Sequence, residues 1–368
     1  MKKALPIISI LILLILISGI GWAIYSTASK DTSVHISPSP TPLPISLEYE
    51  YPIENRTFLM GTAGFVPKNY PNFTNSDISD FWELTSSAGE LHGIYVDWKE
   101  TDIVDPSIIG TDNDIVLELG LQDSKEWNTE TADKLIATAN EFLVNYPNEI
   151  KYLGIGNEVN LLYEDNPQEF GQFVDTYKYI YQEIKSDYPN LYVYTIFHYE
   201  ALRGEGYISG KADIRDPQWD MIAMFAGYND MIAITTYPYM DYTSPNEIPD
   251  DYLTDITDYS DKPIAIVETG WMARQEFGPD LEYLTEQGYT GSEQEQVEYF
   301  MRLLDLTKGN DIEFINWSWI HDIEAWENGT NSEQGNWAIF DSTALRYNNG
   351  NPKEIWYVWI DFLQLRPE

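Results

Sequence analysis

The chain contains no cysteine, and this absence excludes several kinds of chemistry. Among its 368 residues there can be no disulfide, no thiolate metal ligand and no cysteine nucleophile. Only four histidines are present, and they show no metal-ligand spacing with one another. No HExxH motif and no calcium-loop pattern occurs. We therefore expect no catalytic metal and no cofactor.

Basic residues are scarce. The sequence has 21 Lys and Arg against 60 Asp and Glu, a formal net charge of -39. Such a charge repels phosphate backbones and anionic membrane surfaces, so nucleic acid is not expected as a partner, whereas a neutral polymer is not repelled. A solvated carboxylate surface is the ordinary explanation for the rest of the acidity. With 43% hydrophobic and 14% aromatic residues, the chain can still form a sizeable core.

A long uncharged run near the start predicts a membrane segment. Lys2 and Lys3 precede the run from Leu5 to Tyr25, which as a helix can cross a hydrocarbon core of about 30 Å. We expect residues 1–28 to anchor the rest of the chain outside the cell. The alternative is a signal peptide cleaved near Ala28, with secretion. Residues 29–47 contain SPSPTPLP, whose prolines predict an extended linker or stalk.

From residue 48 to residue 368, short β-branched runs alternate with amphipathic stretches, the pattern of repeated βα units. Eight runs predict strands at residues 58–64, 92–98, 114–121, 150–156, 191–197, 231–237, 263–268 and 313–319. Because no glycine-rich phosphate loop opens the first unit, one α/β domain with the (β/α)8 TIM barrel fold is favoured over a doubly wound sheet. Helix starts are predicted at Asn166-Pro167 and at Ser292, with a further helix around Leu135.

Two motifs place a glutamate at the C-terminal end of a predicted strand. GIGNEVN contains Asn157 and Glu158 after the fourth strand, and IAIVETGW contains Glu268 at the end of the seventh. Catalytic groups of such barrels lie at the C-terminal strand ends, so the two carboxyls can face each other across the mouth. A carboxyl pair about 5 Å apart is the equipment of retaining glycoside hydrolysis.

These motifs resemble the retaining glycoside hydrolases of clan A, in which an Asn-Glu pair ends strand four and a second Glu ends strand seven. The resemblance implies that Glu158 is the general acid/base, Glu268 the nucleophile and Asn157 a ligand of the sugar 2-hydroxyl. Tyr237, which closes the sixth strand, would orient Glu268 by a hydrogen bond. IKYLGIGNEVN and ETGW are similar to the β-1,3-glucanase family, and TTYPYM with ETGW is similar to the endo-β-1,4-galactanase family.

Aromatic residues near the strand ends are candidate sugar platforms, because sugar C-H faces stack on indole rings. The candidates are Trp317, Trp319, Trp271 and Trp98, with Trp317 the first choice because it ends strand eight. His198 follows the fifth strand and could contact substrate or serve a structural role. Glu118, in the third strand, either shapes a subsite, if it points inward, or forms a salt bridge.

The sequence thus predicts a retaining β-glycosidase, endo-acting on an extracellular neutral β-linked polysaccharide of galactan or β-1,3-glucan type. We expect a monomer at the cell surface, with a polysaccharide or oligosaccharide as substrate. Two alternatives stay open: a different sugar or exo action, because barrel loops set specificity, and a non-catalytic glycan-binding or adhesion module on the same scaffold. The segment from Asp322 to Asn351 could cover the active-site face or close the barrel base.

Overall fold

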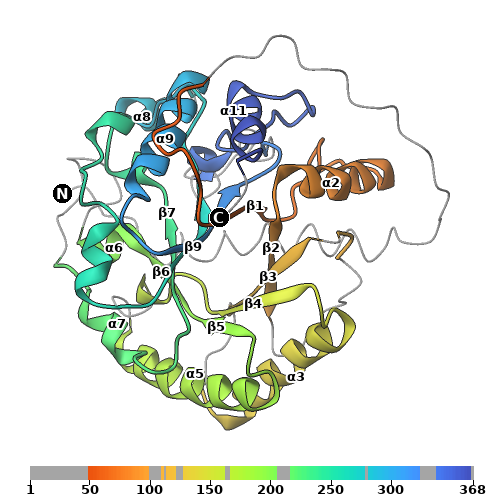
Figure 1. The fold of residues 1–368 in the computed structure, drawn as a ribbon, viewed down its shortest axis with the longest axis vertical. Coiled ribbons are helices and arrows are strands. Elements are labelled where there is room, and N and C mark those ends of the chain that lie inside the picture. Colours follow the sequence, from red (N-terminus) through yellow and green to blue (C-terminus); the bar gives the residue numbers. More distant parts are fainter. Residues whose placement is uncertain are drawn as a thin grey trace.

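The computed structural model describes a parallel α/β barrel (Figure 1). The residues described are 49–98, 109–111, 113–121, 127–161, 166–204, 216–277, 281–323 and 337–365. The predicted membrane segment and the linker lie outside them. Within the described part of the chain, no helix is both long and apolar enough to cross a membrane.

Nine strands form one sheet in the order β5-β4-β3-β2-β1-β9-β8-β7-β6, and every neighbouring pair is parallel. Their bounds are β1 Leu59–Ala63, β2 Leu91–Trp98, β3 Asp114–Leu121, β4 Ile150–Ile155, β5 Tyr192–Tyr194, β6 Ile196–His198, β7 Ile232–Thr236, β8 Ile264–Thr269 and β9 Ile312–Ser318. The eight predicted runs all form strands. The fifth run is divided into β5 and β6, which only Thr195 separates. This short link joins the two ends of the sheet, so the barrel is nearly closed.

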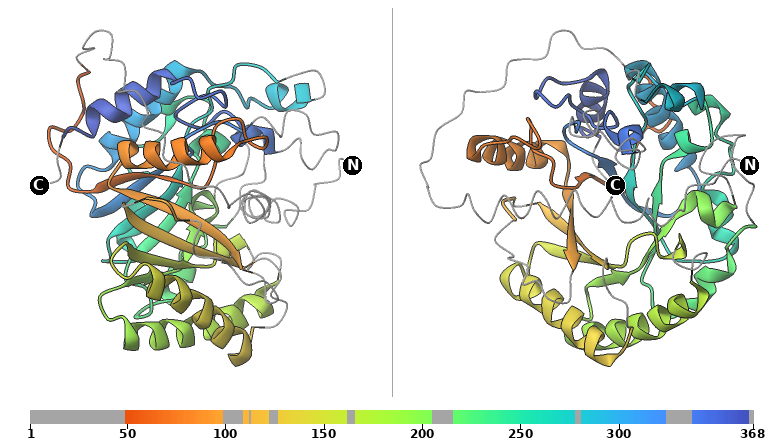
Figure 2. Two further views of the ribbon diagram at one scale, coloured as in Figure 1. Left: turned by 90° about the vertical axis from the view of Figure 1, so that its right-hand side faces the viewer. Right: turned by 180° about the vertical axis from the view of Figure 1, so that it is seen from behind.

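Helices surround the strands on the outside (Figures 1 and 2). The α-helices are α2 Asn75–Ala88, α3 Thr129–Asn145, α5 Pro167–Asp187, α6 Tyr199–Arg203, α7 Asp220–Met224, α8 Glu282–Glu286, α9 Glu293–Leu306 and α11 Glu354–Phe362. Short 3-10 helices are η2 Pro238–Met240, η3 Pro245–Glu247, η4 Thr254–Asp258 and η7 Trp337–Phe340.

The two predicted helix starts and the third predicted helix are confirmed. Asn166 caps α5 through its side chain, and Pro167 occupies the first turn, where its missing N–H costs nothing. The Ser292 side chain accepts a hydrogen bond from the backbone N–H of Glu295 and caps α9. The third helix, around Leu135, is α3, which buries Leu135, Phe142 and other apolar residues. These caps satisfy backbone donors that would otherwise lack partners at the helix ends.

Side chains alternate between the two faces of the barrel wall, as a strand period of two requires. One buried cluster fills the interior and is built from strand residues such as Leu91, Val116, Tyr152, Tyr194 and Phe314. The other lies between the strands and the helices and includes Ile115, Leu117 and Ile315 together with helix residues. Each residue's parity within its strand therefore decides whether it faces the barrel axis or the helix layer.

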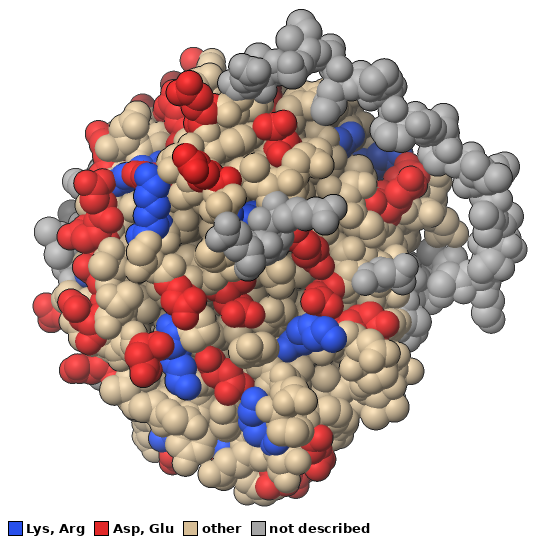
Figure 3. All heavy atoms as spheres, viewed as in Figure 1, with Lys and Arg blue, Asp and Glu red and all other residues tan. Residues whose placement is uncertain are grey.

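The surface carries the acidity that the composition predicts. On the face drawn in Figure 3, Asp and Glu side chains are spread over the surface, with Lys and Arg scattered among them. Surface ion pairs such as Lys308 with Asp305 use some of the few cations. Carboxylates that face solvent cost little and favour solubility.

Candidate active site

A pocket lies at the C-terminal ends of the strands, where the barrel fold predicts an active site. It is lined by Ala63, Gly64, Phe65, Val66, Gly93, Tyr95, Glu118, Asn157, Glu268 and Trp319. These residues come from β1, β2, β3 and β8 and from the segments that follow β1, β4 and β9. The pocket therefore brings together three of the predicted site residues, Asn157, Glu268 and Trp319.

A bulge in β8 positions Glu268. Ile234 and Thr235 are consecutive in β7, yet they pair with Ile266 and Glu268, so β8 holds one extra residue at this point. An extra residue of this kind re-aims the side chains that follow it, and bulges are common beside active sites. Glu268 is 7% exposed, lines the pocket, and accepts a hydrogen bond from the hydroxyl of Tyr237 at 2.9 Å.

Glu158 follows β4 and has a backbone φ of 50°, in the left-handed region that residues other than glycine seldom adopt. Its side chain is 3% exposed, and its Oε1 accepts a hydrogen bond of 2.7 Å from the hydroxyl of Thr235 in β7. Backbone strain of this type is concentrated at functional sites, where the surrounding structure maintains it.

The two carboxyls have different electrostatic environments. Burial raises the pKa of Glu158 to about 8; the hydrogen bond from Thr235 opposes the shift, and the negative charges of Glu268 and Glu200 add to it. Burial also raises the pKa of Glu268, to about 7, and the hydrogen bond from Tyr237 counteracts this effect. Burial thus raises the pKa of both carboxyls from the usual range of a glutamate toward neutral pH.

Asn157 and Trp319 present polar and aromatic groups to the pocket. The Asn157 Oδ1 is buried and has no hydrogen-bond partner among the described residues, so a ligand hydroxyl could satisfy it. Trp319 follows a cis peptide bond after Ser318 and is 5% exposed. A Cβ on Gly64 would come within 2.4 Å of the Trp319 indole, and Gly64 has a φ of 75°. Only glycine meets both conditions at this position.

The other tryptophans lie elsewhere. Trp317 is completely buried, packs against Tyr299 and Trp359, and donates its indole N–H to the Thr343 carbonyl at 2.8 Å. It points toward the helix layer because it is one residue out of phase with Asn316, which lies beside Gly61 and Gly93. No ring face is left for a sugar, so the first choice of platform is corrected from Trp317 to Trp319.

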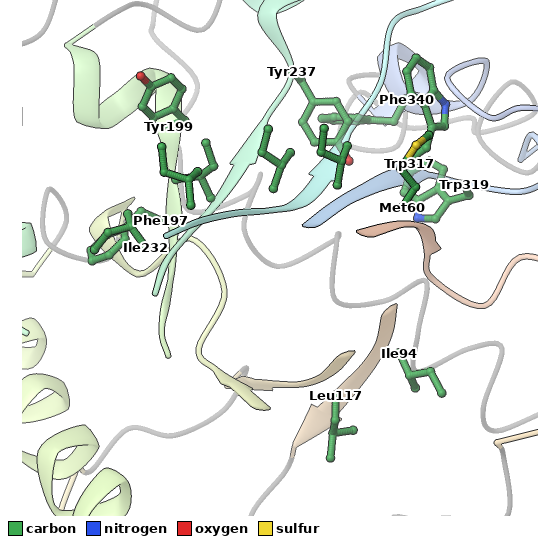
Figure 4. Packing of buried hydrophobic residues seen from close by; sticks show 14 of the residues in the cluster. Met60, Ile94, Leu117, Phe197, Tyr199, Ile232, Tyr237, Trp317, Trp319 and Phe340 are labelled. Atoms are coloured by element: carbon green, nitrogen blue, oxygen red, sulfur yellow. The ribbon is translucent and has the colours of Figure 1, made fainter. Parts of the chain in front are cut away.

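Two more sequence predictions concern aromatic platforms. Trp271 is 0% exposed and packs on Tyr239 and Tyr299, so its ring also contacts protein rather than open pocket. The Trp98 side chain lies outside the part of the chain that the structure describes. Figure 4 shows Trp317, Trp319 and Tyr237 in the same region of the packed interior.

His198 has a structural position. It caps α6, and its Nδ1 accepts a hydrogen bond from the backbone N–H of Ala201 at 3.2 Å. The backbone N–H of His198 donates to Asn160 Oδ1 at 2.7 Å, and the His198 side chain is 3% exposed. These contacts correspond to the structural role that the sequence left open, since His198 does not line the pocket.

Tyr237 is supported by residues that the sequence reasoning missed. Its backbone N–H donates to Glu200 Oε1 at 2.8 Å, and the hydroxyls of Thr236 and Tyr252 donate to the same oxygen at 2.8 and 2.9 Å. Tyr237 also packs against Phe340 with ring centroids 5.0 Å apart (Figure 4). Glu200 follows the fifth predicted strand by three residues, which was the available signal.

The contact between Phe340 and Tyr237 shows on which side of the barrel the C-terminal segment lies. Because Phe340 packs on Tyr237, which bonds Glu268, the described residues 337–353 lie on the active-site side rather than at the barrel base. Gln296 on α9 holds this segment through its side-chain amide, which donates to the carbonyls of Trp271 and Thr343 at 2.7 and 3.0 Å. No group of three or more His, Asp or Glu side chains in the described ranges is arranged to hold a metal ion.

Comparisons with known proteins find solved structures with a similar fold. No family model and no curated protein matches the chain. A GH2 beta-galacturonidase from Eisenbergiella tayi is similar in structure, with a TM-score of 0.54 and 16% identity over 84% of this chain and 52% of that one. A family 39 glycoside hydrolase from Bacteroides cellulosilyticus WH2 has a TM-score of 0.55 and 16% identity, over 83% of this chain and 63% of that one. A beta-D-glucuronidase from Dictyoglomus thermophilum has a TM-score of 0.57 and 13% identity, over 85% of this chain and 52% of that one.

The three similar proteins are glycoside hydrolases by their descriptions, and at these identities the likeness establishes a shared barrel fold. The chain spans about half to two thirds of the length of those proteins, since it covers 52%, 63% and 52% of them. The predicted parallel barrel is therefore confirmed, and the site must carry the argument for activity.

Proposed function

We propose that the chain is a retaining β-glycosidase with Glu268 as nucleophile and Glu158 as general acid/base. The observation that carries the proposal is a pair of buried carboxyls, Glu158 after β4 and Glu268 in β8, each of which accepts a hydrogen bond from a hydroxyl, that of Thr235 and that of Tyr237 respectively. Burial raises the pKa of both, so that one carboxyl can act as acid and the other as nucleophile near neutral pH.

The reaction follows from these roles. Ionised Glu268 attacks the anomeric carbon and forms a glycosyl ester, while Glu158 gives its proton to the departing glycosidic oxygen. Glu158, now ionised, then takes a proton from water, whose oxygen attacks the anomeric carbon and releases Glu268. Both displacements invert that carbon, so its configuration is retained overall. Asn157 is placed to bond the sugar 2-hydroxyl, and Trp319 to contact the ring.

A neutral β-linked polysaccharide outside the cell is the proposed substrate. Among the described residues that line the pocket there is no Lys or Arg, and three of them, Phe65, Tyr95 and Trp319, are aromatic. Aromatic rings favour the apolar faces of sugars, and the net charge of -39 disfavours polyanions. Galactan and β-1,3-glucan, endo action and attachment to the cell surface are the finer parts of this proposal.

The test is release of reducing ends from β-1,4-galactan, β-1,3-glucan, β-mannan and xylan by the purified full-length protein. We expect cleavage of one polymer with retention of anomeric configuration by NMR. We also expect loss of cleavage in Glu268→Gln but not in Glu313→Gln, a control whose carboxylate bonds Tyr152 on β4. Binding without cleavage by the wild-type protein would instead identify a glycan-binding module.

A further inference from the structure

A third carboxyl, that of Glu118, faces the same pocket and has no part in the two-carboxyl mechanism. Val116 belongs to the interior cluster, while Ile115, Leu117 and Leu119 belong to the outer one. Glu118 has the parity of Val116 and therefore points to the barrel axis. It is 3% exposed and lines the pocket together with Glu268 and Asn157.

Glu118 is not satisfied by the protein. Its Oε1 is buried without a hydrogen-bond partner among the described residues. A buried polar oxygen left without a partner costs about 1–3 kcal/mol, so such atoms in a native protein call for an explanation. Because the side chain lines an open pocket, a ligand group can supply the missing bond.

The protonation state of Glu118 is set by its surroundings. Burial raises its pKa well above the usual range, and the negative charge of Glu268 raises it further. Both effects favour the protonated form of Glu118. A protonated carboxyl has one O–H donor and further acceptor capacity, which match the donor and acceptor of a sugar hydroxyl.

A uronic acid meets a different environment in this pocket. Its carboxylate would enter a buried space that holds Glu268 and Glu118, and none of the described residues that line this space is Lys or Arg. A buried charge without a paired cation is costly, and a like charge nearby adds to the cost. The similar barrels described as beta-glucuronidase and beta-galacturonidase act on uronides by name, so the same fold serves a different ring chemistry there.

We propose that Glu118 is a glycone-binding residue that hydrogen-bonds a hydroxyl of a neutral sugar and makes the pocket reject the matching uronic acid. This inference rests on the proposed function for the identity of the site. It adds a residue and a substrate distinction that the two catalytic carboxyls do not provide, since both would act equally on a neutral glycoside and on a uronide.

The first test is calorimetric binding of matched phenyl 1-thio-β-glycosides, which resist hydrolysis, to the full-length wild-type protein. The pairs are glucoside with glucuronide and galactoside with galacturonide, each differing only at C6. We expect the neutral member of one pair to bind and its uronide to bind at least about tenfold more weakly, because none of the described pocket residues offers a cation to the uronide carboxylate. Equal or tighter binding of the uronide, or no binding of any of the four, would overturn the proposal.

The second test assigns the effect to Glu118. Glu118→Leu should weaken binding of the preferred neutral thioglycoside by about tenfold to a hundredfold, and Glu118→Gln, which keeps a donor and an acceptor, should restore most of it. With thioglycosides lacking the 2-, 3-, 4- or 6-hydroxyl, the effect of Glu118→Leu should vanish for one position only. An equal loss across all four deoxy ligands would mark a merely structural role and contradict the proposal.

Hydrolysis of the matching oxygen glycosides separates this proposal from the proposed function. Neutral thioglycosides that bind with the expected pattern, beside oxygen glycosides that are not cleaved, would uphold Glu118 and reject catalysis. Cleavage of both the neutral glycoside and the uronide at similar kcat/KM would uphold catalysis and reject Glu118. The comparison of neutral thioglycosides with uronides uses only the wild-type protein. It therefore still tests the proposal if Glu118→Leu fails to fold.

Discussion

Buried ionisable side chains form ion pairs in one region of this molecule and do not form them in another. In the C-terminal segment, Lys353 is 1% exposed and its ammonium pairs with Asp322 at 2.7 Å, while Arg274 pairs with Asp341 at 3.0 Å. At the candidate site, Glu118 and Glu268 line the pocket and Glu158 follows β4; all three are buried, yet none of them forms an ion pair within the described ranges.

The two regions differ in whether a buried carboxyl has a cation beside it. Burial raises the pKa of Asp322 to about 6, and Lys353 counteracts the shift, so that carboxyl remains ionised near neutral pH. No ion pair of this kind is formed by Glu118, Glu158 or Glu268 among the described residues, and burial raises the pKa of all three. A general acid requires this arrangement, because it must hold a proton at the pH where it works.

The largest effect is expected in the pocket. Glu158→Gln removes the general acid and should lower kcat by about 10²–10⁴-fold on a glycoside with a poor leaving group. Bond cleavage with a 2,4-dinitrophenyl leaving group needs no protonation, so its pre-steady-state burst should be nearly unchanged. Stopped-flow and steady-state rates on both substrates check this. An equal loss of both phases would contradict the acid role.

A large effect on stability is expected in the C-terminal segment. Lys353→Met leaves Asp322 buried without its cation and should lower the free energy of unfolding by about 3–5 kcal/mol. Lys308→Met is the matched control: it breaks an exposed pair with Asp305 and should cost about 0–1 kcal/mol. Denaturant unfolding compares them. Equal costs would remove the distinction between the two kinds of ion pair.

A smaller effect is expected from the group that lowers the pKa of the nucleophile. Tyr237→Phe removes the hydrogen bond to Glu268, so the pKa of Glu268 rises and the acid limb of the kcat/KM profile moves to higher pH, by about one unit. Tyr239→Phe is the control, because its ring packs on Tyr237 and its hydroxyl makes no hydrogen bond among the described residues. An unmoved limb in Tyr237→Phe would contradict the role of this bond.

The smallest effect concerns stability and pH. The pKa of Glu118 is raised in the folded state, so the stability from its proton is complete below the unfolded pKa and is lost as pH rises toward the folded pKa. Glu118→Gln does not titrate, so its Tm relative to wild type should rise as the pH is raised from 5 to 8. Thermal unfolding at both pH values checks this, and a constant difference would contradict the shift.

The sequence predicted the barrel because its strands are continuous β-branched runs with turn residues at their ends. Glu158 and Glu268 could be identified for the same reason, since each closes such a run. Parity was readable too: Glu118 is two residues from Val116, and Trp317 is one residue out of phase with the interior residue Asn316. Treating every strand-end residue as part of the site led to the error at Trp317.

Other features depend on contacts between distant segments, which residue patterns do not encode. The bulge in β8 arises from its register against β7 and β9, and nothing within IAIVETGW shows it. The packing of Phe340 on Tyr237 joins residues 103 positions apart, so the side of the barrel that the C-terminal segment covers could not be predicted. Gly64 makes room for Trp319 for the same long-range reason.

The central claim is that Glu268 forms the covalent bond to the sugar. The most direct test incubates the full-length protein with the 2-deoxy-2-fluoro β-glycoside of the sugar it cleaves, whose glycosyl ester hydrolyses slowly, and maps the adduct by peptide mass spectrometry. The account predicts one sugar per chain, attached to Glu268. An adduct on Glu118 or Glu158, or turnover with inversion and no adduct, would contradict it.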